Sequence, residues 1–347
     1  MSNSKINSRH KDFNIGDYHS RTIIYKKLLP FFSTISKNQC LKSIHKHGDE
    51  YSYEINNGLL KLERRIGSNS RYGVIFLSSN NIDKTMFATK LMIKDKYNHN
   101  EIIIAEKLSD ITLKDLNPHF LLVFKHFECN YSKERDNNIP TIIKFDSYYI
   151  CVNELVSGNL KQFINEHNSN NNLIFNAFQQ VLITILSFHY YTGGYYHNDC
   201  HYKNFLYHKI TPGGYFHYKL FDKDVYIKNL GFLFIIWDFG LTKTKPVYKE
   251  QHIKDYFRIV DFFDSVNSSP IYLRPNSSSS TSSSSLNNIE KIARNILKYQ
   301  DNYYKFFGHS DKLFFENLLF KFNNFFLFDI DKKSTIINKK PYIIKDF

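Results

Sequence analysis

Hydrophobic and polar positions alternate in short runs through the first half of the chain, a pattern that predicts β-strands. Residues 72–77 and 85–93 form two such runs, and the turn-forming residues 78–83 between them predict a hairpin. Residues 120–127 and 141–152 predict two further strands. This half of the chain should therefore contain an antiparallel sheet.

Hydrophobic positions recur at helical spacing first in residues 100–116 and then through most of the second half. Further helices are predicted at residues 160–165, 176–191, 289–299 and 312–322. Between them, the aromatic, glycine-punctuated stretch 204–237 predicts a run of hairpins whose last strand is 231–237. Strands that precede helices in this way indicate an α+β fold.

Two segments lie outside this pattern. Residues 1–58 are mostly polar and basic, and we interpret them as an N-terminal extension to which the sequence assigns no chemistry. Residues 268–288 contain a serine tract that cannot bury apolar area, and we expect a disordered surface insert there.

Composition supports a globular protein, because 42% of the 347 residues are hydrophobic and 17% are aromatic. The formal charge is +13, from 46 Lys and Arg against 33 Asp and Glu. A basic balance favours anionic partners. The basic residues are scattered along the whole chain, however, and do not form a stripe or an arm, so we do not expect nucleic acid to be the partner.

The cysteines and the apolar runs indicate the compartment. Four cysteines lie far apart and form neither a zinc-binding pattern nor a disulfide framework, which favours a reducing, intracellular compartment. The longest apolar run, residues 230–237, is much shorter than the roughly 20 residues that span a membrane. The N-terminus has no apolar signal stretch. We predict a cytoplasmic protein with no membrane contact.

The strongest chemical signal is the stretch 197–206, His-Asn-Asp-Cys-His-Tyr-Lys-Asn-Phe-Leu, which is followed downstream by Trp-Asp-Phe-Gly. Phosphoryl transfer needs a carboxylate to orient the attacking hydroxyl and oxygen ligands for Mg²⁺. Asp199 and Asn204 place one carboxylate and one amide on a single loop, and Asp238 adds a carboxylate at the end of a strand.

These motifs resemble those of the protein-kinase superfamily, whose catalytic loop reads His-Arg-Asp with a following Asn and whose metal-binding turn reads Asp-Phe-Gly. The resemblance implies a two-lobed kinase-like fold that uses ATP and Mg²⁺, with a small β-rich N-lobe and a larger helical C-lobe. The N-lobe would span about 59–153 and the C-lobe about 154–347. Asp199 would be the catalytic base, and Asn204 and Asp238 would bind the metal.

Upstream motifs fit the same resemblance. Residues 66–75 are similar to the Gly-rich loop over ATP phosphates, although the middle glycine is missing. By this resemblance Gly67, Gly73 and Ile75 contact the nucleotide. Residues 87–90, Phe-Ala-Thr-Lys, are similar to the family's Val-Ala-Ile-Lys strand, which makes Lys90 the lysine that holds the phosphates.

Two further roles are implied for the nucleotide site. A glutamate of the next helix should hold Lys90, and we favour Glu101 over Glu106 because Glu101 shares its helical face with apolar residues. Glu106 would match the family's usual spacing better. Residues 152–160 resemble the hinge between lobes, where main-chain atoms of Glu154 and Val156 would pair with adenine.

Departures from the family pattern leave the acceptor open. Asn198 replaces the Arg before the catalytic Asp, and His201 replaces the Lys that Ser/Thr kinases carry there. The loop is therefore also similar to that of aminoglycoside and choline phosphotransferases, so a small-molecule kinase is one alternative, with His201 a catalytic residue. A nucleotide-binding pseudokinase is another, although each acidic and amide ligand is retained.

No Ala-Pro-Glu motif follows the Asp-Phe-Gly turn, and the next apolar helix begins within a short distance. The whole combination looks most like the divergent kinase-like proteins of giant DNA viruses. We therefore expect a divergent Ser/Thr kinase acting on a hydroxyl-bearing acceptor, a protein in our first interpretation, in the host cytoplasm if the protein is viral.

Overall fold

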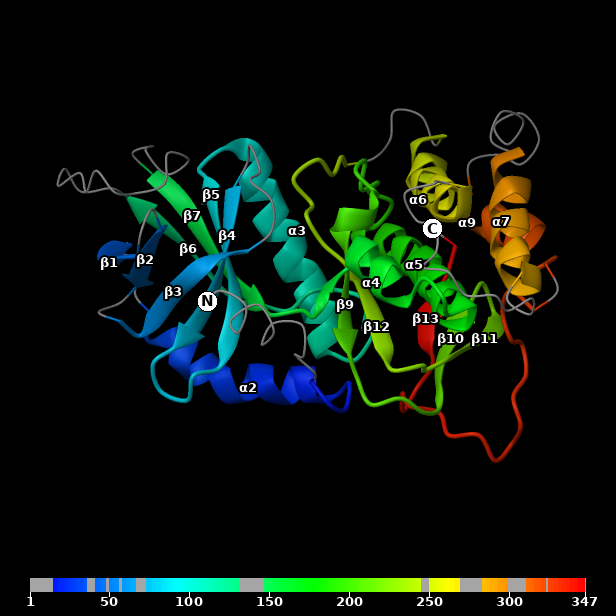
Figure 1. Ribbon diagram of the computed structural model, residues 1–347, viewed down its shortest axis with the longest axis horizontal. Coiled ribbons are helices and arrows are strands. Elements are labelled where there is room, and N and C mark those ends of the chain that lie inside the picture. Colours follow the sequence, from blue (N-terminus) through cyan, green and yellow to red (C-terminus); the bar gives the residue numbers. More distant parts are fainter. Residues whose placement is uncertain are drawn as a thin grey trace. The chain divides into compact units, whose positions relative to one another are not determined.

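The computed structural model describes ten segments of the chain, namely residues 15–35, 41–47, 50–55, 58–66, 73–130, 147–244, 250–268, 283–298, 310–322 and 324–346. They divide into two compact units (Figure 1). The sheet unit comprises His19–Leu113 and Leu121–Val156, and the helical unit comprises Met1–Tyr18, Lys114–Phe120 and Ser157–Phe347. Strands and helices occur in both, so the predicted α+β class is confirmed.

The sheet unit is built on a seven-stranded antiparallel sheet of order β1-β2-β3-β4-β5-β7-β6. Its strands are β1 (Lys42–His47), β2 (Glu50–Ile55), β3 (Leu60–Ile66), β4 (Gly73–Asn80), β5 (Met86–Ile93), β6 (Val123–Asn130) and β7 (Ser147–Glu154). β4 and β5 form the hairpin predicted from the sequence. Asp83 stabilises its turn, because its carboxylate accepts hydrogen bonds from the backbone and hydroxyl of Thr85.

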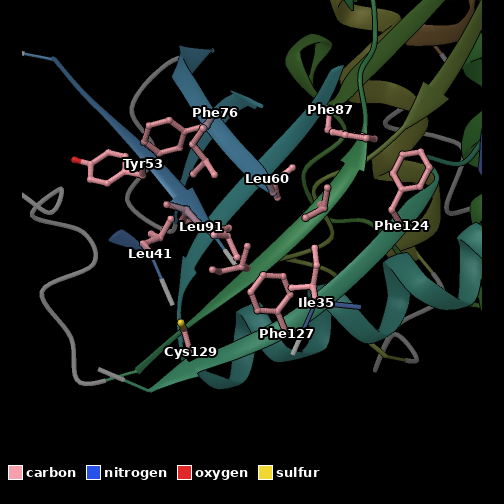
Figure 2. Close-up of a cluster of buried hydrophobic side chains, with 14 of the residues drawn as sticks. Ile35, Leu41, Tyr53, Leu60, Phe76, Phe87, Leu91, Phe124, Phe127 and Cys129 are labelled. Carbon is pink, nitrogen blue, oxygen red and sulfur yellow. The ribbon is translucent and has the colours of Figure 1, made fainter. Parts of the chain in front are cut away.

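Helices α2 (Ser20–Ser33) and α3 (Lys96–Leu113) contribute to separate hydrophobic clusters of this sheet. Phe32 of α2 belongs to a cluster that includes Leu91 of β5, shown in part in Figure 2. Ile102 of α3 instead packs in a cluster with Met92, the next residue of β5. Because successive strand residues point to opposite faces, the two helices cover opposite faces of the sheet.

Part of the segment before residue 59, which we interpreted as an N-terminal extension, packs into the sheet unit. Helix α2 supplies Leu28 and Phe32 to the buried core, and β1 and β2 form one edge of the sheet. The sequence did not predict this role, because the basic and apolar residues of α2 follow no regular helical pattern and the helix contains Pro30. Burial of its apolar side depends on a sheet formed by residues far along the chain.

The helical unit combines helices with two three-stranded sheets, β11-β10-β13 and β12-β9-β8. Its described helices are α4 (Leu160–His167), α5 (Asn171–Thr192), α6 (Glu250–Ser268), α7 (Ser283–Lys298) and α9 (Asp311–Phe314). Its strands are β8 (Gly158–Asn159), β9 (Phe205–Lys209), β10 (Tyr215–Leu220), β11 (Lys223–Lys228), β12 (Phe232–Ile236) and β13 (Tyr342–Ile344). The predicted run of hairpins over residues 204–237 is confirmed only for β10 and β11, because β9 pairs with β12 and not with the next strand along the chain.

Helix α5 is the central helix of this unit. It begins at the Asn170 cap, whose side chain accepts a hydrogen bond from Leu173 N, and it ends at Gly193, whose φ of 75° favours glycine. Within the described residues, α5 is the helix long and apolar enough to cross a membrane, but 83% of its most apolar window is buried inside the protein. That burial is typical of the core helix of a soluble domain.

Two predictions for the C-terminal part need correction. Residues 283–288 of the expected disordered insert belong to helix α7, while residues 269–282 lie outside the described residues. The predicted helix over 312–322 is a short α-helix, α9, followed by a π-helical turn over Phe315–Leu319. Strand β13, which the sequence did not reveal, pairs in parallel with β10, and such long-range pairing leaves no local signal.

The cysteines differ from the expectation of a reducing compartment in one respect. Cys129 of β6 is disulfide-bonded, while Cys151 and Cys200 are free and buried. Cys40 lies outside the described residues. Burial raises the pKa of the Cys151 thiol to about 12, so this thiol stays protonated at neutral pH.

Candidate functional site

The loop between α5 and β9 closes Asp199 and Asn204 into one hydrogen-bonded turn. The Asn204 Nδ2 group donates to the backbone carbonyl of Asp199 at 3.0 Å and to its Oδ2 at 3.1 Å. The short 3-10 helix η2 (Tyr202–Asn204) brings Asn204 back toward Asp199. His201 caps this helix by accepting a hydrogen bond from Lys203 N. The two residues that the sequence singled out on this loop are therefore in contact.

Asp199 is a half-buried carboxylate with two cationic or hydrogen-bonding neighbours. His201 Nε2 lies 3.4 Å from Asp199 Oδ2, and the Arg258 guanidinium lies 3.5 Å from Oδ1. Burial acts to raise the pKa of Asp199, but the hydrogen bond from His201 and the charge of Arg258 outweigh it and hold the pKa below its usual value. Asp199 is thus ionised at neutral pH and can accept a hydrogen bond from a hydroxyl.

The Trp-Asp-Phe-Gly turn follows β12 and is tied to this loop through the peptide of Trp237. Trp237 N donates to Asn204 O at 3.1 Å, and His197 Nε2 donates to the Trp237 carbonyl at 3.0 Å. Burial lowers the pKa of His197, which agrees with a neutral ring that donates through one nitrogen. The two motifs, separated by 40 residues in sequence, are therefore joined at one peptide.

Two residues of these motifs adopt the left-handed backbone conformation. Asn198 has φ 64° and Asp238 has φ 65°. Asn and Asp are the non-glycine residues that tolerate this region best, and such conformations concentrate at functional sites. Phe239, directly after Asp238, stacks on Phe188 of α5 with nearly parallel rings and is buried, which anchors the turn.

In the sheet unit, Lys90 of β5 pairs with Glu101 of α3. The Lys90 Nζ to Glu101 Oε1 distance is 2.5 Å, and both side chains are almost fully buried. Glu106 instead contacts His126. The geometry agrees with the sequence preference for Glu101 as the partner. A buried pair of this kind is costly unless both charges are satisfied, and here the ammonium and the carboxylate are in direct contact.

The other residues of the sheet unit that the sequence analysis expected to contact a nucleotide have fewer informative contacts. Ile75 of β4 is the register partner of Lys90. Gly73 has a packing reason to be glycine, because an added Cβ would lie 2.7 Å from Leu91 O. Gly67 lies outside the described residues.

The strand that the sequence predicted to form the hinge ends at Glu154. The hydrogen bonds of Glu154 limit which of its atoms could contact adenine. Its backbone N–H donates to Leu122 O at 2.9 Å, so only its carbonyl could pair with adenine. Its carboxylate accepts from Leu122 N and from both Nε and an Nη of Arg21 in α2. Val156, half-buried, is the last residue of the unit.

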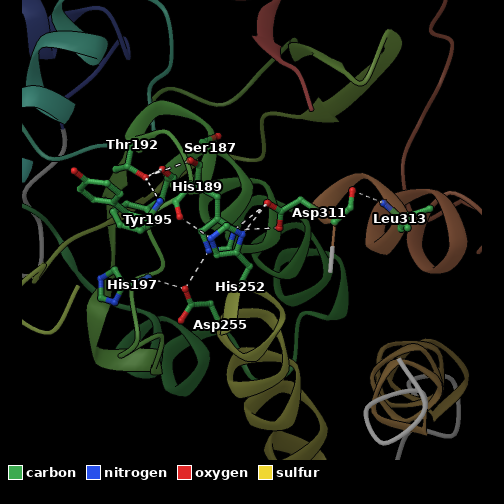
Figure 3. A network of polar contacts seen from close by, with 12 residues as sticks. Ser187, His189, Thr192, Tyr195, His197, His252, Asp255, Asp311 and Leu313 are labelled. Carbon is green, nitrogen blue, oxygen red and sulfur yellow. Dashed lines mark hydrogen bonds and ion pairs between the residues drawn. The ribbon is translucent and has the colours of Figure 1, made fainter. Parts of the chain in front are cut away.

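A second polar cluster lies in the core of the helical unit (Figure 3). His189 of α5 contacts Asp255 of α6 through Nε2 at 3.1 Å and Asp311 of α9 through Nδ1 at 3.1 Å. His252 of α6 stacks on His189 and hydrogen-bonds to Gly194 O through Nε2. The side chains of these four residues are all buried.

Ligand atoms of His189, His252 and Asp311 lie within 4.8 Å of one another, a spacing that a metal ion could use. The two imidazole rings are only 19° from parallel, with centroids 4.5 Å apart. Nitrogen lone pairs lie in the ring plane, so nearly parallel rings do not direct them at one point. Asn204 and Asp238, the metal ligands expected from the sequence, do not belong to this cluster.

Sequence reasoning missed several of these residues. Arg258 of α6 donates a hydrogen bond to Asn198 O at 2.7 Å. It thereby brings a guanidinium group to the loop, in which Asn198 stands at the position where the kinase motif has Arg. Asp255 and Arg258 are three residues apart on one helix face, which was a usable signal. Nothing local indicates His189, Asp311 or Arg21, because their partners lie far away in sequence.

A comparison with models of protein families finds no match to this sequence. A comparison with curated proteins finds none either.

Proposed function

We propose that this protein is an ATP-dependent phosphotransferase, in the first instance a divergent Ser/Thr protein kinase with a kinase-like two-lobed fold. The observation that carries the proposal is the joining of two motifs at the Trp237 peptide, which His197 and Asn204 bind from the catalytic loop. If Asp199 and Asp238 only capped local turns, no hydrogen bonds between these two distant segments would be needed.

In this proposal Asp199 is the base and Asn204 and Asp238 are the Mg²⁺ ligands. The acceptor hydroxyl gives its proton to Asp199, its oxygen forms a bond to the γ-phosphorus of ATP, and the bond to the bridging oxygen breaks to release ADP. Asn204 binds Asp199 through its NH₂ group, so its Oδ1 is the atom suited to a metal. Mg²⁺ would offset the charge of the phosphates.

The sheet unit would bind the nucleotide. Lys90 would contact the α- and β-phosphates while Glu101 holds its ammonium group, as their buried contact supports. Gly73 and Ile75 would lie along the phosphates, and the carbonyl of Glu154 and the main chain of Val156 would contact adenine. The sheet unit would then correspond to an N-lobe and the helical unit to a C-lobe.

A small-molecule acceptor is the second candidate, and one observation favours it. His201 lies beside the catalytic carboxylate at 3.4 Å, in the position where the sequence resembles aminoglycoside and choline phosphotransferases. A histidine there gives the acceptor site a hydrogen-bonding ring where protein kinases of the Ser/Thr type carry a lysine.

The experiment is incubation of the protein with γ-labelled ATP and Mg²⁺, alone, with a protein extract and with a metabolite extract. Label in protein supports the first candidate, and label in small molecules supports the second. The Asp199→Asn variant is the control for contaminating kinases. Equal labelling by that variant, or ATP binding without transfer to any acceptor, would contradict the proposal, and the latter result would favour a pseudokinase.

Activity is expected not to depend on phosphorylation after the Asp-Phe-Gly turn. Thr242 is buried, which shields it from a modifying enzyme, and Thr244 is exposed; Tyr248 lies outside the described residues. Arg258 already binds the loop through Asn198 O. A Thr242→Ala, Thr244→Ala double variant and phosphatase-treated wild type should both retain their rate. A loss beyond about tenfold, roughly 1.4 kcal/mol of barrier, would show that a phosphate is needed.

A further inference from the structure

The buried cluster of His189, His252, Asp255 and Asp311 takes no part in the proposed chemistry, yet it connects directly to the catalytic loop. The Asp255 carboxylate accepts hydrogen bonds from two successive backbone N–H groups, those of His197 at 2.7 Å and Asn198 at 2.9 Å. These are the two residues before Asp199. Asp255 therefore determines the path of the backbone that carries the catalytic carboxylate.

The Asp255 carboxylate also accepts a hydrogen bond from a buried side chain of the helical unit. His189 Nε2 donates to Asp255 Oδ2, and His189 Nδ1 donates to the Asp311 carboxylate, whose two oxygens lie 3.1 and 3.2 Å away. Donation through both nitrogens requires the imidazolium form. Figure 3 shows His189 between the two carboxylates.

Asp311 comes from a part of the chain far from the catalytic motifs. It is the first residue of α9, which is capped by Ser310. It is buried, 122 residues from His189 in sequence. His189 contacts both Asp311 and Asp255, so its orientation depends on both carboxylates.

We propose that Asp311 positions the catalytic carboxylate through His189 and Asp255. This inference rests on the proposed phosphotransferase function for its catalytic meaning. Helix α9 thereby acts on the reaction without touching substrate. Loss of the Asp311 charge weakens the hydrogen bond that orients His189, weakens the hold of His189 on Asp255, and loosens the backbone N–H groups that precede Asp199.

The charges around His189 support this arrangement and give it a pH window. In the described part of the chain, Asp255, His252 and Tyr256 of α6 and Asp311 of α9 are titratable groups in contact with its ring, and the Cys200 thiol contacts Asp255. Burial acts to lower the pKa of His189, but the two carboxylates outweigh it and raise the pKa to about 9 from the ordinary 6.5. The stabilisation is complete below the ordinary value and is lost as pH rises through about 9.

The test compares Asp311→Asn with Ser310→Ala, which weakens the cap of α9 but leaves the carboxylate in place. In Asp311→Asn we expect kcat to fall about tenfold with little change in KM for ATP. Removal of one carboxylate lowers the pKa of His189, so the alkaline limb of the kcat profile should move down by about one pH unit or more. Ser310→Ala should keep the limb of the wild type.

Hydrogen-exchange mass spectrometry of the peptide containing His197 and Asn198 provides a readout that does not need activity. Its exchange should accelerate about tenfold in Asp311→Asn, while the peptides of β9 and β12 change little. An unmoved alkaline limb, or unchanged exchange in the folded variant, would overturn the positioning role. If the wild type transfers no phosphate, the proposed function fails, and the exchange result still decides whether Asp311 holds the loop.

Discussion

Asp199→Asn is expected to reduce phosphoryl transfer by about 10²- to 10⁴-fold, the usual contribution of a positioned general base. An amide cannot accept the hydroxyl proton, whereas its oxygen can still accept the hydrogen bond from Asn204 that closes the loop. The carboxylate is only half-buried, so its replacement should change the melting temperature little. Steady-state transfer from labelled ATP measures the first effect, and thermal unfolding measures the second.

Two comparisons make this prediction specific. Asp261→Asn alters an exposed carboxylate of α6, in the same unit, and should leave the rate unchanged. Asp238→Asn should reduce transfer as severely as Asp199→Asn, because it removes a proposed metal ligand, and its defect should ease at high Mg²⁺. Retention of wild-type turnover by Asp199→Asn would remove the mechanism, whatever the fold.

Arg21→Met is expected to destabilise the sheet unit by about 3–5 kcal/mol, the usual result of removing one partner from a buried ion pair. The Arg21 guanidinium and the Glu154 carboxylate are both almost entirely buried. Methionine keeps much of the apolar length of the side chain but leaves the Glu154 charge without its cation. Denaturant unfolding measures the loss as a lower midpoint with an unchanged slope.

The exposed pair of Lys27 and Asp83 offers the matched control, since it joins the same helix to the sheet. Lys27→Met should cost no more than about 1 kcal/mol, as surface pairs do. Adding Glu154→Gln to Arg21→Met should recover part of the loss, because the neutral amide can still accept the hydrogen bond from Leu122 N. A loss for Arg21→Met no larger than that for Lys27→Met would show that the buried pair does not hold α2.

The elements that follow from local pattern were predictable from the sequence. The β4–β5 hairpin has alternating positions around a strong turn, and α3 buries Ile102, Ile104 and Leu108 at helical spacing. Helix α5 is a long apolar helix with Asn and Gly at its ends. Their boundaries moved by a few residues. The sequence also placed Asp199 and Asn204 on a single loop, and the structure then showed that their side chains are hydrogen-bonded.

Contacts between distant segments were decided only by tertiary structure. The burial of α2, the parallel pairing of β13, the Arg258 contact and the His189 cluster each join residues far apart along the chain. From the sequence alone, Arg21 in its polar N-terminal stretch would be interpreted as a solvent-exposed charge. Only the folded structure shows that it pairs with Glu154. The sequence by itself determined which residue types were present for chemistry and which local elements carried them. Folding alone determined which buried charges meet, because a single sequence records no distances between residues that are remote from each other.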